Sequence, residues 1–237
     1  MKAVILAGGL GTRLRPFTEV IPKPLLPLGE KSLMEVQIQT LKSYGFDTIY
    51  VATNYMSDYI EAFLGDGSRY GVTLKFSRET KPLGTCGPLT LLADELTEPF
   101  LMMNGDILTK LNLRDFFETA VRHEALLTVA TKIISTPFRF GNVMVDEDGC
   151  IASIEEKPDL KMEILAGIYG IKPGIINLIP RGEYFGMDHL LKRMIAEARK
   201  VYRHQIQEYW LDIGQIEDYS KAREAYQVHF GAGEDAK

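Results

Sequence analysis

The amino-acid sequence predicts an α/β protein with three layers, in which helices cover both faces of a central, mixed but mostly parallel sheet. Short apolar runs alternate with amphipathic helical segments along the first half of the chain, which is the pattern of an open parallel sheet. Loops rich in Gly and Pro follow the apolar runs. The 237 residues suit a single domain, which can bury enough surface to fold without a disulfide or metal staple.

The first predicted strand, at 2–7, is apolar throughout and ends at a glycine pair, as a buried parallel strand does. A loop at 8–30 follows and contains four prolines. A helix at 32–44 comes next, and Glu35 lies three residues after Ser32, which is the spacing of a capping box. The same alternation predicts strands at 48–53, 72–77, 99–103 and 126–131, and helices at 58–64, 89–96 and 113–124.

The second half of the chain changes character. Segments at 142–146 and 151–155 flank an Asp-Gly turn and predict a hairpin. The remaining predicted elements are a strand at 164–171, a helix at 187–198, short strands at 200–203 and 209–213, and a final helix at 215–228. No linker interrupts them, so we expect one Rossmann-like domain over 1–230 with a small β extension, followed by a disordered tail at 231–237.

Charge and cysteine content exclude several protein classes. The net charge of −5 argues against a general binder of nucleic acids or membrane surfaces, although residues 1–32 alone carry +3, from five Lys or Arg and two Glu. Cys86 and Cys150 lie far apart and outside any CxxC pattern, so we expect no disulfide framework and a cytoplasmic location. The N-terminal apolar run is too short for a signal peptide or a membrane span.

The loop after the first strand has the composition of a phosphate-binding loop. Its three glycines, within 8–11, let backbone N–H groups approach a ligand closely, and Arg13, Arg15 and Lys23 supply cations. Leu14 stands where a dinucleotide fingerprint needs its third glycine, and no GxxxxGK[ST] segment is present. The loop therefore predicts a polyphosphate ligand held by neither a Rossmann dehydrogenase motif nor a P-loop.

Two aspartates are candidates for a metal site. Asp106 closes a strand in an Asn-Gly-Asp turn, and Asp212 follows a short apolar strand and precedes Gly214. Mg²⁺ usually takes one or two carboxylates together with substrate phosphates. The pair, combined with the basic glycine loop, predicts a phosphoryl-transfer site that uses Mg²⁺.

Six motifs resemble those of the sugar-1-phosphate nucleotidyltransferases, or nucleotide-sugar pyrophosphorylases. They are GGLGTRLRPFT at 8–18, PKPLLPLGEKSLMEVQIQTL at 22–41, PLGTCGPL at 82–89, MNGD at 103–106, EEKP at 155–158 and YWLDIG at 209–214. The chain is most similar to the short mannose- or heptose-1-phosphate guanylyltransferases. The resemblance implies the nucleotide-diphospho-sugar transferase fold and a catalytic domain alone, without the C-terminal β-helix of larger relatives. A homodimer is left open.

The resemblance also implies a reaction and a set of site residues. A sugar 1-phosphate would attack the α-phosphorus of a nucleoside triphosphate in line, giving an NDP-sugar and pyrophosphate. Because the attacking oxygen is already anionic, no general base is needed. The implied nucleotide-binding residues are Leu6, Ala7, Gly8, Gly9, Gly11, Thr12, Arg13, Glu79 and Gly84. The implied sugar-phosphate residues are Gly141, Glu156, Lys157 and Gly167, and the implied catalytic residues are Arg13, Lys23, Asp106 and Asp212, of which the two aspartates would ligate Mg²⁺.

Glu79 is the residue that indicates which nucleobase the protein binds. It lies five residues before Gly84, where relatives that use UTP or dTTP often have a glutamine. A carboxylate only accepts hydrogen bonds, which suits the adjacent N1–H and N2 amino group of guanine better than uracil. We therefore favour GTP, while UTP, dTTP or CTP as donor, or a catalytically silent sugar-nucleotide sensor or partner subunit, remain alternatives. The sequence does not choose between mannose 1-phosphate and a manno-heptose 1-phosphate.

Overall fold

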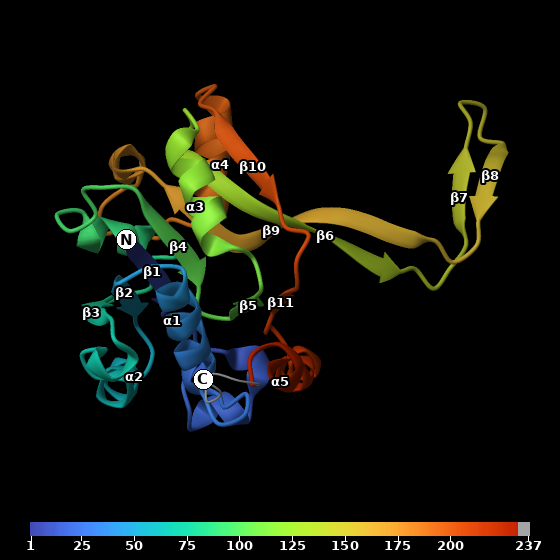
Figure 1. The fold of residues 1–237 in the computed structure, drawn as a ribbon. Helices are drawn as coiled ribbons and strands as arrows, with labels where there is room; N and C mark the ends of the chain where they lie inside the picture. Colours follow the sequence, from blue (N-terminus) through green and yellow to red (C-terminus); the bar gives the residue numbers. More distant parts are fainter. Residues whose placement is uncertain (232–237) are drawn as a thin grey trace.

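A seven-stranded sheet forms the centre of the computed structural model, which describes residues 1–231 (Figure 1). Its strands, in spatial order, are β10 (Val201–Gln205), β6 (Leu127–Pro137), β9 (Asp159–Ile171), β4 (Phe100–Asn104), β1 (Lys2–Ala7), β2 (Thr48–Thr53) and β3 (Thr73–Arg78). Only β9 runs antiparallel to its neighbours, so the prediction of a mixed, mostly parallel sheet is confirmed. Of the tail predicted at 231–237, all but Gly231 lies outside the described residues.

Helices cover both faces of this sheet, which confirms the three layers. The helices are α1 (Leu33–Ser43), α2 (Ser57–Leu64), α3 (Leu113–Arg122), α4 (Met187–Ala196) and α5 (Ile216–His229). Along β1, Ala3 and Ile5 pack in the core cluster that contains α1, α2 and α3, whereas Val4 packs in the cluster that contains α4. This alternation follows from the period of two in a strand.

The loop at 8–30 contains three short 3₁₀ helices, Thr12–Leu14, Phe17–Glu19 and Lys23–Leu25. A third core cluster fixes it in place, because Leu14 and Leu26 pack with Tyr219 and Tyr226 of α5. The Tyr219 hydroxyl also donates a 2.6 Å hydrogen bond to the Pro27 carbonyl. The first long loop of the chain is therefore held by its last helix.

The predicted capping box is present at the start of α1. The Ser32 hydroxyl accepts from the Glu35 N–H, at 3.3 Å, and the Glu35 carboxylate accepts from the Ser32 N–H, at 2.8 Å. Within residues 1–231, no helix has the length and apolar content needed to cross a bilayer.

Three segments differ from the prediction. The helix predicted at 89–96 is a short 3₁₀ helix, Gly87–Leu92, which begins with a proline in its first turn. A short strand that was not predicted, β5 (Ile107–Thr109), pairs antiparallel with β11 (Trp210–Asp212). Strands β6 and β9 run several residues further than predicted, because they stay paired as a ribbon after leaving the sheet.

This ribbon forms an arm, which we define as residues 132–164. Beyond the outer parts of β6 and β9 it carries the predicted hairpin, β7 (Asn142–Val145) and β8 (Ile151–Glu155), which pair only with each other. Figure 1 shows the arm projecting far from the body of the protein, with the hairpin at its end.

Candidate active site

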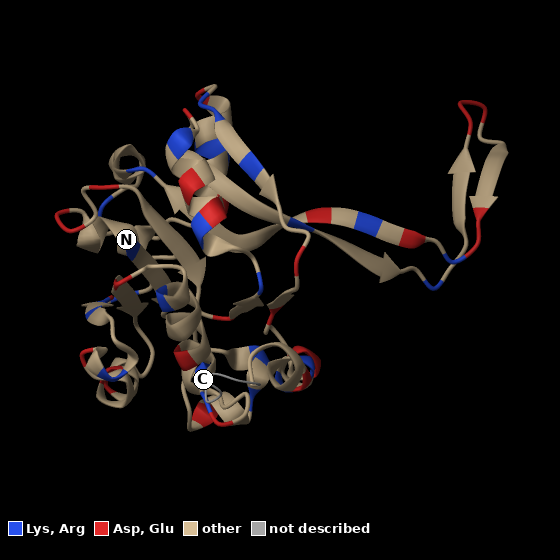
Figure 2. Ribbon diagram, in the orientation of Figure 1, with Lys and Arg blue, Asp and Glu red and all other residues tan. Residues whose placement is uncertain are grey.

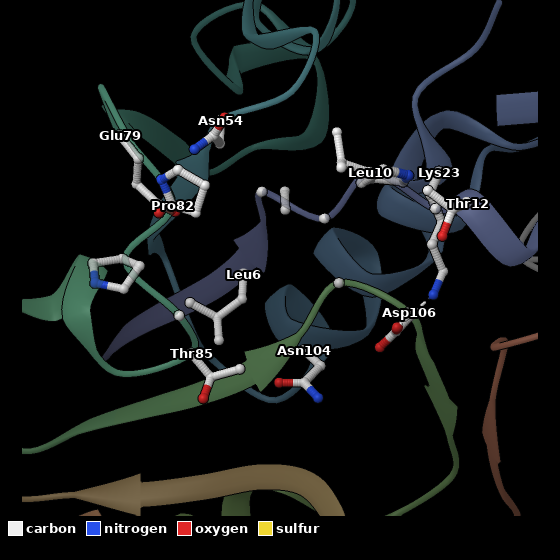
Figure 3. A pocket seen from close by; sticks show the side chains of 18 of the residues that line it. Leu6, Leu10, Thr12, Lys23, Asn54, Glu79, Pro82, Thr85, Asn104 and Asp106 are labelled. Carbon is white, nitrogen blue, oxygen red and sulfur yellow. Dashed lines mark hydrogen bonds and ion pairs between the residues drawn. The ribbon is translucent and has the colours of Figure 1, made fainter. Parts of the chain in front are cut away.

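A cavity of about 510 Å³ opens at the carboxyl ends of β1 and β4 (Figure 3). These strands are paired, with Leu6 opposite Asn104, so the loops that follow them meet at one edge of the sheet. This edge is where open α/β sheets bind ligands. The cavity brings together these predicted residues: Leu6, Ala7, Gly8, Gly9, Gly11, Thr12, Arg13, Lys23, Glu79, Gly84 and Asp106.

Gly11 gives the glycine loop its shape. Its φ of +61° lies in the left-handed region, and a Cβ placed there would come within 2.8 Å of the Thr18 side chain. The Thr18 hydroxyl in turn donates a 2.7 Å hydrogen bond to the Gly11 carbonyl. Any other residue at this position would strain the loop that lines the cavity.

Lys23 and Asp106 form an ion pair at one end of the cavity. The Lys23 Nζ lies 2.5 Å from the Asp106 Oδ2, and the two side chains are only 12% and 25% exposed. Figure 3 shows them pointing toward each other. The other oxygen of Asp106, Oδ1, is buried without a hydrogen-bond partner in the described part of the chain, and so is Asn104 Oδ1. Buried oxygens in this condition are available to a further donor or cation.

The β5–β11 pair brings Asp212 beside Asp106. Asp212 lies opposite Ile107, and the Ile213 N–H donates a 3.0 Å hydrogen bond to the Asp106 carbonyl. Partial burial, and secondly the charge of Asp106, raise the pKa of Asp212 to about 6, against the lowering effect of Lys23 and Arg13. Because ionising Asp212 in this position costs free energy, a nearby cation would stabilise its charged form.

The two aspartates fit a magnesium ion. Residues 1–231 contain no group of three or more His, Cys, Asp or Glu side chains that could hold a metal by themselves. Mg²⁺ does not need one, since it binds through one or two carboxylates and takes its other ligands from water and substrate phosphates. The unpartnered Oδ1 of Asp106 and the adjacent Asp212 supply that donor set.

Gln37 and Trp210 hold this end of the cavity in place. The buried Gln37 amide donates hydrogen bonds to the carbonyls of Asn104 and Ile107, at 3.0 and 2.8 Å, and so ties α1 to the turn that carries Asp106. The Trp210 indole N–H donates to the Ala166 carbonyl at 2.8 Å and anchors β11 to β9. The prediction missed Gln37, because nothing near it in the sequence marks its contact with a turn 67 residues away.

Glu79 lies at the opposite end of the cavity from Lys23 and Asp106, beside Pro82 and Asn54 (Figure 3). Its Oε2 accepts a 2.8 Å hydrogen bond from the Leu83 N–H. Burial raises the pKa of Glu79, and its hydrogen bonds with Leu83 and Asn54 partly oppose that rise. The cavity thus has one end with an acceptor and one end with cations and carboxylates.

Other lining residues were not predicted: Leu10, Pro24, Asn54, Pro82, Thr85, Pro88, Asn104, Gly105, Tyr184 and Gly214. Asn54 could have been found, because it directly follows β2, whose carboxyl end lies at the same edge as that of β1. Tyr184 comes from the loop before α4, and the sequence around it carries no signal of this contact.

The predicted sugar-phosphate residues form two separate groups, since Gly141 lies against Glu156, whose Oε2 is 3.0 Å from a Cβ placed at Gly141, but Gly167 lies elsewhere. Gly167, on β9, lies against the cavity, since a Cβ there would come within 2.8 Å of the Asn104 side chain. Gly141, Glu156 and Lys157 instead lie on the arm and do not line the cavity. The β6–β9 ribbon carries them away from the body, and their assignment to the sugar phosphate stays a prediction.

This geometry defines an α/β protein with a basic, glycine-rich loop and a carboxylate pair at one edge of its sheet. Residues 2–228 match the Nucleotidyl transferase family, and the chain belongs to that family. The fold is that of the nucleotide-diphospho-sugar transferases. A solved structure from Bacillus anthracis, provisionally described as a glucose-1-phosphate thymidylyltransferase, has a TM-score of 0.79 and 26% identity, with 98% of each chain covered.

Two curated relatives differ in their nucleotide. Mannose-1-phosphate guanylyltransferase 1 of Arabidopsis thaliana is 36% identical, over 92% of this chain and 63% of its own length. UTP–glucose-1-phosphate uridylyltransferase of Synechocystis sp. is 33% identical, over 94% of this chain and 62% of its own length. The chain thus spans less than two thirds of these relatives.

Proposed function

We propose that the protein transfers a nucleotidyl group from a nucleoside triphosphate to a sugar 1-phosphate and releases pyrophosphate. The observation that carries the proposal is a cavity that combines the Gly11 loop, Arg13 and Lys23 with Asp106; Asp212 does not line this cavity but interacts with the charges of Asp106, Lys23 and Arg13. Family membership and relatives described as sugar-1-phosphate nucleotidyltransferases support it.

Each residue would interact with a different charged group of the substrates. The sugar phosphate brings its own anionic oxygen to the α-phosphorus, so the chain needs to position and neutralise charge rather than abstract a proton. Arg13 would stabilise the leaving pyrophosphate, and Lys23 would lie on the α-phosphate side. Asp106 and Asp212 would hold Mg²⁺, which when bound neutralises phosphate charge.

We further propose GTP as the preferred donor. Glu79 lies at the end of the cavity away from the cations, where a base would lie if the phosphates occupy the other end. Its carboxylate can accept two adjacent N–H donors from guanine, whereas uracil presents one N–H between two carbonyls. The guanylyltransferase relative agrees with this proposal, and the uridylyltransferase relative keeps UTP as the alternative.

The test is a matrix of GTP, UTP, dTTP and CTP against mannose, manno-heptose and glucose 1-phosphates, assayed by pyrophosphate release with Mg²⁺. We expect release with GTP and one of the first two sugar phosphates. The Asp106→Asn variant serves as the matched inactive control. No release with any pair would contradict the proposed activity and favour a sugar-nucleotide sensor, whereas equal turnover of GTP and UTP would overturn only the proposed preference for GTP.

A further inference from the structure

The hairpin at the end of the arm exposes apolar side chains on both of its faces. Phe140, Val143, Met144, Val145, Ile151 and Ile154 are each between 48% and 69% exposed. β7 and β8 pair only with each other among the described strands. A two-stranded hairpin is marginal in water without a further layer, so this one needs a surface to cover it.

The arm does not fold back on the body, although the β6–β9 register has an irregularity at its root, between Val129 and Thr131. From Thr131, opposite Leu165, to Pro137, opposite Asp159, the β6–β9 pairing continues without interruption. A bend within this ribbon would break its ladder of hydrogen bonds, and each unpaired backbone group would lose its partner. The ribbon therefore directs the hairpin outward, as Figure 1 shows.

The cavity, meanwhile, lacks positive charge for the proposed reaction, and this step rests on the proposed function. Arg13 and Lys23 are the Lys and Arg residues among those that line it, and Lys23 is already paired with Asp106. A triphosphate and a sugar phosphate together carry more negative charge than Arg13 and the Mg²⁺ proposed at Asp106 and Asp212 neutralise. A cation for the sugar phosphate would therefore have to come from outside the cavity lining.

Lys157, at the base of the hairpin, is suited to that role. Its side chain is 69% exposed, and the nearest carboxylate, that of Glu156, lies 3.8 Å away. Its backbone φ is +48°, a left-handed conformation that is uncommon for a residue other than glycine. Strain of this kind gathers at functional sites, where the surrounding structure maintains it.

A second copy of the chain presents a surface that matches the arm. The hairpin tip is acidic, with Asp146, Glu147 and Asp148 in a row, and is red in Figure 2. The segment beside the cavity exposes Arg15, whose Nε lies 3.9 Å from the Glu19 carboxylate, and Arg13, which also lines the cavity. The same segment exposes large apolar side chains, Phe17, Val20 and Ile21, at 44%, 69% and 39%. This segment therefore offers positive charge to the acidic tip and apolar side chains to the exposed apolar side chains of the hairpin.

We infer that two copies exchange arms about a two-fold axis, so that Lys157 and Glu156 of each copy complete the sugar-phosphate side of the cavity in its partner. Such an interface is self-complementary, because each copy contributes one arm and one segment beside its cavity. Each cavity is then complete only in the dimer.

Mixing two inactive variants tests the exchange. Asp106→Asn disables the cavity and leaves the arm intact, and Lys157→Ala does the reverse. Random pairing of equal amounts, by co-expression, makes half of the dimers mixed, each with one complete cavity, so about a quarter of the wild-type rate should return. If the arm serves its own cavity, the mixture stays at the mean rate of the two variants. An inactive wild-type protein would instead refute the proposed function.

The matched control is Lys161→Ala, which removes another exposed lysine of the arm. This variant should retain wild-type activity alone. If Lys161→Ala and Lys157→Ala lose activity equally, the loss reflects damage to the arm, and the assignment of Lys157 to the cavity is overturned.

A cross-linking experiment tests the exchange without an activity assay. Cys150 at the hairpin tip is exposed and Cys86 is buried, so a short bis-maleimide reagent reacts at the tip. We expect it to join Cys150 of the unaltered chain to the new thiol of an Arg15→Cys, Cys150→Ser chain, giving a covalent dimer. The Cys150→Ser chain without the Arg15 substitution is the control. A product within one chain of a second Arg15→Cys variant that keeps Cys150, or a protein that stays monomeric, overturns the exchange.

Discussion

Lys23 Nζ lies 2.5 Å from the Asp106 Oδ2, at the carboxyl edge of the sheet. The lysine therefore neutralises a carboxylate that we propose as a magnesium ligand, and the two cations compete for it. Replacing Lys23 with Met should strengthen the binding of Mn²⁺, used as a spectroscopic substitute for Mg²⁺, by about tenfold in the absence of nucleotide, while turnover falls about 100-fold. Electron paramagnetic resonance measures the free Mn²⁺. Unchanged Mn²⁺ affinity would show that the two cations do not share Asp106.

Asp106→Asn should lower kcat by about 10³-fold or more, because the amide keeps the shape of the side chain but loses the charge that holds the metal. The fold should persist, since Asp106 lies in a turn at a strand end rather than in the core, and Tm should stay within about 4 °C of the wild type. Steady-state kinetics and calorimetry check both statements. Near-normal turnover at saturating Mg²⁺ would refute the metal role.

The pKa of Asp212, raised from 3.8 to about 6, makes a prediction about pH. Between these two values the folded protein binds a proton more tightly than the unfolded chain, so ionisation of Asp212 costs stability as the pH rises through this window. Asp212→Asn should therefore stabilise the metal-free protein at pH 7, by about 1 kcal/mol after allowance for solvent screening of a partly exposed group. Urea unfolding at pH 4 and at pH 7 measures this, and a gain of equal size at both values would contradict it.

Glu79→Gln should reduce the preference for GTP over UTP. The amide replaces one acceptor oxygen with a donor that faces the N–H groups of guanine, which costs about 1–3 kcal/mol, or about 10- to 100-fold in kcat/KM for GTP. Turnover of UTP should stay level or rise. Glu30→Gln, an exposed substitution outside the cavity lining, is the matched control. An equal loss with both nucleotides would place Glu79 away from the base.

Gln37→Leu should act through the turn that carries Asp106. It removes two buried hydrogen bonds to the carbonyls of Asn104 and Ile107 and should cost about 2–3 kcal/mol in the free energy of unfolding. With the turn loosened, the KM for Mg²⁺ should rise more than the KM for the nucleotide. Gln39→Leu on the same helix, which loses one bond from the Lys31 side chain, is the control. A fall in stability with an unchanged KM for Mg²⁺ would leave Gln37 a purely structural role.

Much of this cavity could be predicted because its parts lie directly after buried strands. The bounds of β1 and β2 were predicted to the residue, and the Gly11 loop and Asp106 follow strands whose apolar runs are unambiguous. Asp212 was predicted because it follows the short apolar strand expected at 209–213, but its place beside Asp106 depends on the pairing of β5 with β11, which have three residues each. Their pairing joins segments about 100 residues apart, which no local pattern reports.

For the arm, the sequence predicted the hairpin itself but not its position relative to the body. The Asp-Gly turn between two short segments predicted the hairpin at 142–155, because each strand and its turn are local. The direction of the ribbon that carries it depends on how far the β6–β9 pairing continues past the sheet. For this reason no sequence pattern indicated that Glu156 and Lys157, which the resemblance assigned to the sugar phosphate, lie on the projecting arm and outside the cavity lining.

The packing of the loop at 8–30 under α5 has a consequence for synthesis on the ribosome. The glycine loop leaves the ribosome early, but Tyr219 and Tyr226, which hold it, are made almost 200 residues later. A nascent chain could pair β1 with β2 well before then, while the loop beside them still lacked half of its core. The glycine loop, although made early, would thus reach its final shape only after α5 is made, and binding of a nucleotide would have to await translation of that helix.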